Sequence, residues 1–143
     1  MTALFAGSFN PFTIGHYDIA SRALALCDRL VIAVGVNYDK DAASDNRVET
    51  IRRYFANDTR VEVMTYNELT TDLAREVGAT VLIRGVRNAR DLEYERDMAA
   101  ANRELSGIET ILLPARAEYE HISSSLVREL SHYGKDVSKY LPR

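Results

Sequence analysis

Short apolar runs alternate along the chain with segments whose apolar residues recur at helical spacing. Two runs, 30–34 and 81–83, are apolar at every position, as expected of parallel strands covered on both faces. The runs predict strands at Ala3–Ala6, Arg29–Val36, Val61–Thr65, Thr80–Ile83 and Thr110–Leu113. The intervening segments predict helices at His16–Cys27, Arg47–Phe55, Thr71–Val77, Leu92–Leu105 and Ser124–Tyr133.

Strands that alternate with helices through short connections imply right-handed βαβ units. We therefore expect an α/β fold: a single Rossmann-like domain over residues 1–143, with a doubly wound five-stranded parallel sheet and helices on both faces. Ligands of such sheets bind at the carboxyl ends of the strands, near the point where the strand order reverses. The residues that follow each strand are thus the first candidates for a functional site.

The first strand runs into a turn rich in glycine and proline, and a helix begins near His16. Gly7 permits a close backbone approach, Ser8 offers a hydroxyl, and the helix start presents unpaired N–H groups. Together with the imidazole, these are the parts of a phosphate-binding site. The turn lacks the sequences of a Walker loop and of a dinucleotide fingerprint. The alternative is an ordinary strand-to-helix turn with a capping histidine.

Two arginines, Arg84 and Arg87, flank Gly85 just after the fourth predicted strand. Guanidinium groups beside a flexible backbone suit phosphate oxygens, but the same arginines could instead pair with Asp91 or Glu93 in a solvated turn. Acidic residues in the first turn of the next helix, 91–95, complement the helix dipole. Its last carboxylate, Glu95, is the one that could turn toward the site, to meet a ribose or to fix an arginine.

Three consecutive serines, 123–125, open the last predicted helix, where hydroxyls and free N–H groups can bind an anion. A plain helix cap needs one serine, so the cluster favours a ligand site. Arg128 adds positive charge nearby, unless it is an exposed helical arginine. Lys40 follows the second strand and is either a surface lysine or a cation that reaches into the site.

Eighteen basic and 21 acidic residues give a net charge of −3, which argues against a nucleic acid or anionic membrane partner. The single Cys27 excludes an internal disulfide and fits a reducing compartment, and its place in an apolar row predicts a buried structural thiol. We expect a cytoplasmic protein, since neither a signal peptide nor a transmembrane segment is evident. His121 and His132 lack ligand-like spacing with carboxylates, so no protein metal site is assigned.

The turn Gly7-Ser8-Phe9-Asn10-Pro11…Gly15-His16, together with Ile122-Ser123-Ser124-Ser125-Leu126-Val127-Arg128, resembles the paired signatures of the nucleotidyltransferase superfamily. Added to these, Lys40 and the runs 83–87 and 91–95 resemble the bacterial phosphopantetheine adenylyltransferases of coenzyme A biosynthesis. The resemblance extends over nearly the whole chain. Asn10 stands where that family usually has aspartate, and it also occurs in the nicotinamide branch, so the first signature alone does not separate the two.

The resemblance implies transfer of an adenylyl group from ATP to 4′-phosphopantetheine, which gives dephospho-coenzyme A and pyrophosphate. It implies catalytic roles for His16, Lys40 and Arg87. It implies ATP contacts at Ser8, Phe9, His16, Gly85, Val86, Arg87, Glu95, Tyr119, Glu120, His121, Ile122, Ser123, Ser124 and Ser125. It implies phosphopantetheine contacts at Ser8, Lys40, Thr70 and Arg84, with Mg²⁺ carried by the ATP phosphates and a homohexameric assembly.

Two other functions stay open. A nicotinamide or nicotinate mononucleotide adenylyltransferase would use the same scaffold with another acceptor; Arg84 and the run 91–95 argue against it. A nucleotide-binding regulator without catalysis is a different class. Such a protein should have lost His16, Lys40 or the serine cluster, and all three are present.

Overall fold

A computed structural model describes residues 1–37 and 46–143 and contains a fully parallel five-stranded sheet. Its strands are β1 (Thr2–Gly7), β2 (Arg29–Gly35), β3 (Val61–Tyr66), β4 (Val81–Val86) and β5 (Glu109–Pro114), in the order β3-β2-β1-β4-β5. The helices are α1 (Ile14–Ala23), α2 (Arg47–Tyr54), α3 (Thr70–Val77), α4 (Ala89–Ser106) and α5 (Ser124–His132). Two 3₁₀ turns, Ala117–Tyr119 and Ser138–Tyr140, follow β5 and α5. The expected Rossmann-like α/β fold is confirmed.

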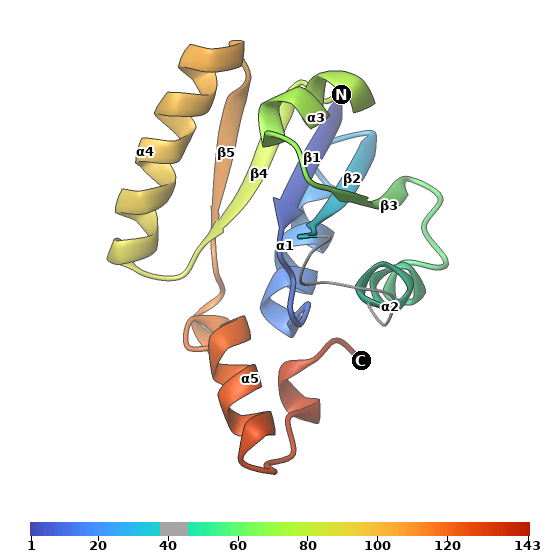
Figure 1. The fold of residues 1–143 in the computed structure, drawn as a ribbon, viewed down its shortest axis with the longest axis vertical. Coiled ribbons are helices and arrows are strands. Elements are labelled where there is room, and N and C mark those ends of the chain that lie inside the picture. The colour runs from blue at the N-terminus through green and yellow to red at the C-terminus, as the bar shows by residue number, and fades with distance from the viewer. Residues whose placement is uncertain (38–45) are drawn as a thin grey trace.

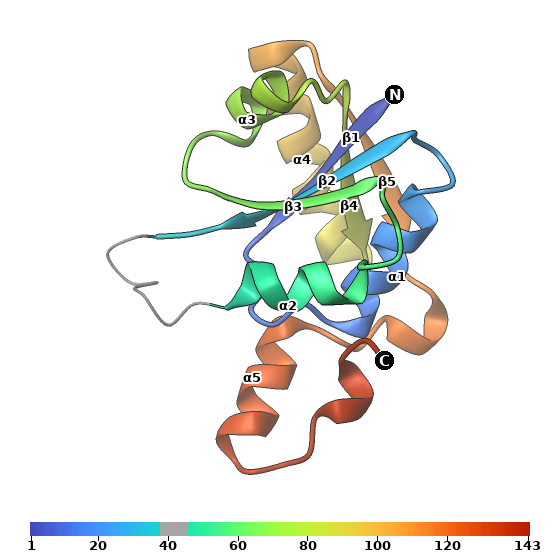
Figure 2. The ribbon, with the colours of Figure 1, turned by 90° about the vertical axis from the view of Figure 1, so that its right-hand side faces the viewer.

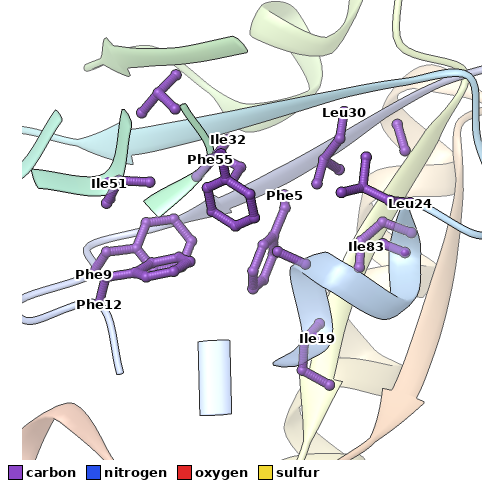
Figure 3. Close-up of a cluster of buried hydrophobic side chains, with 14 of the residues drawn as sticks. Phe5, Phe9, Phe12, Ile19, Leu24, Leu30, Ile32, Ile51, Phe55 and Ile83 are labelled. Atoms are coloured by element: carbon purple, nitrogen blue, oxygen red, sulfur yellow. The ribbon is translucent and has the colours of Figure 1, made fainter. Parts of the chain in front are cut away.

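Helices α1 and α2 cover one face of the sheet, while α3 and α4 cover the other (Figures 1 and 2). Successive residues of β1 point to opposite faces, so Leu4 and Phe5 belong to different clusters. Phe5 packs with residues of α1 and α2, such as Ile19 and Ile51 (Figure 3). Leu4 packs with Leu73 of α3. Helix α5 and the C-terminal residues lie beyond the carboxyl ends of the strands (Figure 1).

Strand β4 continues farther than the sequence predicts. It pairs with β5 up to Val86 and Pro114, so Arg84 and Gly85 lie inside the strand rather than in a turn after it. A Cβ on Gly85 would lie 3.1 Å from Cγ1 of Ile19 in α1. The glycine is therefore explained by the close packing of α1 on β4, and not by a flexible turn.

Two helix boundaries differ from the prediction by three residues or more. Helix α1 ends at Ala23, and Cys27 lies beyond it, partly buried against the core, with its Sγ donating to the Ala23 carbonyl at 3.3 Å. Helix α4 begins at Ala89 because the Asn88 side chain caps it, accepting from the Asp91 N–H at 2.9 Å. Within residues 1–37 and 46–143, no helix is both long and apolar enough to cross a membrane.

Candidate active site

The turn after β1 is built around the buried ring of Phe9. This ring is 3% exposed and makes edge contacts with Phe5 and Phe12, at centroid distances of 5.0 and 5.1 Å (Figure 3). The Phe9 backbone has a φ of +45°, a strained conformation for a residue with a side chain. A Cβ on Gly7 would lie 3.1 Å from the Phe9 ring, so a larger residue here would force the ring to shift. The core thus fixes the conformation of the turn that carries Ser8.

Side chains from α2 and α5 hold the carbonyl groups of this turn. Arg47 donates to the Ser8 carbonyl at 2.6 Å, and Arg128 donates to the Asn10 carbonyl at 2.6 Å. The Ser124 hydroxyl donates to the Pro11 carbonyl at 2.8 Å. The bonds from Arg128 and Ser124 attach the two signature segments to each other, although these segments lie more than a hundred residues apart in the chain.

His16 and Thr13 form a reciprocal capping pair at the start of α1. The Thr13 hydroxyl accepts from the His16 N–H at 3.2 Å, and the Thr13 N–H donates to His16 Nδ1 at 3.0 Å. Because a backbone N–H can only donate, Nδ1 is the acceptor nitrogen of the ring. The neutral ring therefore carries its proton on Nε2, which is free to serve as a hydrogen-bond donor.

The surroundings of His16 keep its imidazole neutral. Burial, together with the positive charges of Arg84 and Arg87, lowers its pKa from 6.5 to about 4. At neutral pH the ring cannot act as a cation or as a general acid. It can act as a fixed donor to an anion.

Arg84 and Glu95 form a two-bond ion pair between β4 and α4. Arg84 Nε and Nη2 donate to the two carboxylate oxygens of Glu95 at 2.8 and 2.7 Å, and Nη1 donates to the Ala6 carbonyl at 2.6 Å. Burial alone would lower the pKa of the Arg84 guanidinium, but the hydrogen bonds that it donates to Glu95 raise the pKa above its ordinary value. Arg84 is therefore a permanent cation in a fixed position, and Glu95 is the carboxylate that fixes an arginine.

Arg87 is held differently, by the first turn of α4. Its Nε and its backbone N–H each lie 3.1 Å from Oδ2 of Asp91. The Arg87 side chain is 35% exposed, so its guanidinium remains open to solvent on one side. The sequence left open whether Arg84 and Arg87 pair with acidic residues of the next helix. Arg87 pairs with Asp91, whereas Arg84 pairs with Glu95.

Two cavities open at the carboxyl edge of the sheet, one on each side of β1 and β4. The first is lined by residues of β1, α1, β4 and α5: Phe5, Ala6, Gly7, Ser8, Phe9, Thr13, Gly15, His16, Ile19, Arg84, Gly85, Val86, Arg87, Ala115, Tyr119, Ile122, Ser123 and Ser124. The second lies against α4 and is lined by Leu4, Ala6, Gly7, Ser8, Gly35, Tyr66, Thr70, Leu82, Ile83, Arg84, Tyr94, Glu95, Met98, Ala99, Asn102 and Thr110. Ser8 and Arg84 belong to both, so the two cavities meet at these residues.

The structure thus brings together most of the residues that the sequence singles out. Glu120, His121 and Ser125 line neither cavity, and Lys40 lies outside the described residues. The serine hydroxyls have protein partners: Ser123 caps α5 at Leu126, Ser124 donates to the Pro11 carbonyl, and Ser125 accepts from Arg128. Each of the three serines thus has a structural contact, so the presence of three serines does not by itself require a ligand.

Sequence reasoning missed the outer wall of the second cavity. Tyr94, Met98 and Asn102 line this cavity and recur at four-residue spacing along α4. Tyr66, the last residue of β3, also lines it, and its hydroxyl lies 3.3 Å from that of Thr70. The four-residue spacing of these three side chains could have predicted that they share one face of the helix. Among the described residues, no group of three or more His, Cys, Asp or Glu side chains could hold a metal ion.

The fold and the paired signatures define a nucleotidyltransferase: the cytidylyltransferase-like family model matches residues 4–130. Phosphopantetheine adenylyltransferase of Porphyromonas gingivalis is 51% identical, over 98% of this chain and 93% of that protein. The enzyme of the same name from Bacteroides fragilis is 45% identical, over 99% of this chain and 95% of that protein. This chain belongs to the phosphopantetheine adenylyltransferase family.

A solved structure supports the fold. It is the bifunctional NMN adenylyltransferase/ADP ribose pyrophosphatase of Francisella tularensis, with a TM-score of 0.75 and 13% identity. The match covers 99% of this chain and 45% of that one. At such low identity the likeness concerns the architecture alone.

The low pKa of His16 predicts a pH dependence of stability. Between pH 6.5 and 4 the unfolded chain binds a proton at this residue and the folded chain does not, so the free energy of unfolding falls as the pH is lowered, by up to about 3 kcal/mol. The His16→Gln variant keeps a capping side chain but cannot titrate. Urea unfolding at pH 4.5 and 7 should show a smaller loss for this variant, and equal losses would contradict the assignment.

Removing Glu95 should destabilise the fold. Glu95→Ala leaves Arg84 with an uncompensated charge, which we expect to cost about 2 kcal/mol of unfolding free energy. This is below the cost for a fully buried pair because the Arg84 side chain is 37% exposed. The matched control is Glu93→Ala, an exposed carboxylate on the same helix, which should change stability by less than about 0.5 kcal/mol in urea unfolding. Equal effects of the two substitutions would refute a role for the pair.

Proposed function

We propose that this chain catalyses reversible adenylyl transfer from ATP to 4′-phosphopantetheine, which yields dephospho-coenzyme A and pyrophosphate. The observation that carries the proposal is the pair of cavities that share Ser8 and Arg84. A two-substrate transfer needs two adjacent sites whose reacting groups meet. The curated relatives named as phosphopantetheine adenylyltransferases support this choice of substrates.

In this proposal ATP occupies the first cavity and phosphopantetheine occupies the second. The phosphate of phosphopantetheine attacks the α-phosphorus of ATP, and the bond to the bridging oxygen of pyrophosphate breaks. A phosphate dianion is already nucleophilic, so the reaction needs no general base and no covalent intermediate. Catalysis then consists of aligning two anions and neutralising the charge of the pentavalent transition state.

His16 is the proposed donor to the α-phosphate. Its Nδ1 is occupied by the Thr13 N–H, which leaves Nε2–H for a ligand in the first cavity. A neutral donor held by a helix cap needs no reorganisation as charge develops on the phosphate oxygens. The positive dipole end of α1 adds to the same effect.

The remaining proposed roles belong to cations and to a helix start. Arg84, at the junction of the two cavities, holds the acceptor phosphate together with Lys40. Arg87 and the N-terminus of α5 hold the β- and γ-phosphates as pyrophosphate leaves. Glu95 acts through Arg84, which its carboxylate orients. We propose that Mg²⁺ arrives bound to the ATP phosphates, as part of the substrate.

We further propose that residues 1–143 act as one nucleotidyltransferase domain in the cytoplasm, where a single partly buried thiol suits the reducing conditions. We also propose a homohexamer. The support on this chain is the set of apolar side chains exposed on α4: Leu92, Tyr94, Met98 and Leu105, which are 41–64% exposed. Light scattering should give six chain masses, and a single chain mass would refute the assembly.

The proposed reaction is tested by pyrophosphate release from ATP with three acceptors in parallel: 4′-phosphopantetheine, nicotinamide mononucleotide and nicotinate mononucleotide. We expect release with phosphopantetheine alone. His16→Ala should lower turnover about a hundredfold or more, since a lost transition-state donor costs on the order of 3–4 kcal/mol. The control is His132→Ala at an exposed histidine of α5, which should retain normal turnover.

Three results would overturn parts of this proposal. Release with a mononucleotide instead would assign the chain to the nicotinamide branch. ATP binding without release for any acceptor would make it a nucleotide-binding regulator. Near-normal turnover of a folded His16→Ala protein would remove the proposed role of His16.

A further inference from the structure

A three-residue ion network joins α1 to the segment that follows β5, and the proposed reaction makes no use of it. Asp18 Oδ1 accepts from Arg116 Nε at 2.8 Å, and Asp18 Oδ2 accepts from Arg22 Nη1 at 3.1 Å. The Asp18 side chain is 14% exposed, whereas those of Arg22 and Arg116 are 31% and 57% exposed. The carboxylate is thus the enclosed centre of the network.

Both arginines attach the carboxylate to the end of β5. Arg22 Nη1 also donates to the carbonyl of Pro114, the last residue of β5, at 2.9 Å. Arg116 lies two residues farther along, at the N-cap of the 3₁₀ turn Ala117–Tyr119. Asp18 therefore holds the segment 114–116 at two points, one through its backbone and one through a side chain.

This segment forms one wall of the first cavity, and α1 forms a neighbouring wall. Ala115 and Tyr119 line the cavity from the segment, while His16 and Ile19 line it from α1. The Ala115 N–H donates to the Val86 carbonyl at 2.7 Å, which attaches the segment to the sheet. The network at Asp18 joins the same segment to α1 and thus connects the two walls of the cavity.

We propose that Asp18 is a positioning residue for the nucleotide substrate: through Arg22 and Arg116 it fixes the segment 114–119 against α1. This inference rests on the proposed function, in which the first cavity binds ATP. Asp18 lines neither cavity and acts only through the two arginines. The Arg116 side chain is 57% exposed and its ion pair contributes little to stability, so loss of this pair should appear in nucleotide binding rather than in folding.

The test separates the two substrates. In Asp18→Asn we expect the KM for ATP to rise about tenfold, while kcat and the KM for phosphopantetheine change less than about twofold. The Kd for ATP, measured by equilibrium dialysis without an acceptor, should rise by the same factor. A general loss of structure would instead impair both substrates and kcat together.

A double-mutant cycle identifies the path of the effect. Arg116→Ala should also raise the KM for ATP, and the Asp18→Asn/Arg116→Ala double variant should be no worse than Asp18→Asn, because both changes break the same contact. The matched control is Arg103→Ala. Arg103 is 57% exposed, as Arg116 is, and pairs with Glu109 at the opposite end of β5, 3.5 Å away. It should leave the KM for ATP unchanged.

An unchanged Kd and KM for ATP in folded Asp18→Asn would overturn the inference, as would an equal effect of Arg103→Ala. If Asp18→Asn does not fold, Arg116→Ala, whose side chain is mostly in solvent, decides the question in the same assays. Failure of the proposed function is recognised separately. A wild-type protein that binds ATP but does not use phosphopantetheine refutes that function, while the Kd for ATP still decides the role of Asp18.

Discussion

The separation of β1 from β4 at the carboxyl edge of the sheet is the constraint on which the site depends. The two strands pair only up to Phe5 and Ile83, although both continue beyond these residues. Arg84 spans the resulting crevice, with Glu95 on α4 and the Ala6 carbonyl on β1 as its partners. Strand order reverses at this point, where open α/β sheets bind their ligands. The positive charge of Arg84 is thus fixed between the two cavities, and both cavities remain open.

Much of the fold was predictable because buried parallel strands are apolar on both faces, as 30–34 and 81–83 are. The errors occur where a local signal competes with tertiary packing. β4 continues through the polar Arg84 because β5 pairs with it and Glu95 neutralises its charge. α1 ends before Cys27 although the apolar row continues, since residues packed against a core need not be helical.

The candidate site was predictable to the extent that strand ends meet at one edge of a sheet. Residues from the two signatures do line one cavity. Which arginine pairs with which carboxylate, however, depends on the directions of the side chains, and the spacing of residues in the sequence does not specify these directions. Asp91 and Glu95 occupy one helix and have separate partners, Arg87 and Arg84. The partners of the three serines were unpredictable for a similar reason, because each hydroxyl bonds to a distant or local group that the sequence does not identify.

The place of Cys27 has a chemical consequence for an enzyme whose acceptor ends in a thiol. The residue lies between α1 and the start of β2, at the edge of the sheet opposite both cavities. Burial raises the pKa of its thiol, and its Sγ is bound to the Ala23 carbonyl, so little thiolate forms at neutral pH. Mixed disulfides form when a thiolate attacks an existing disulfide and expels its other sulfur as a thiolate. Oxidised, disulfide-linked pantetheine can therefore meet the enzyme without being captured by the protein's own sulfur.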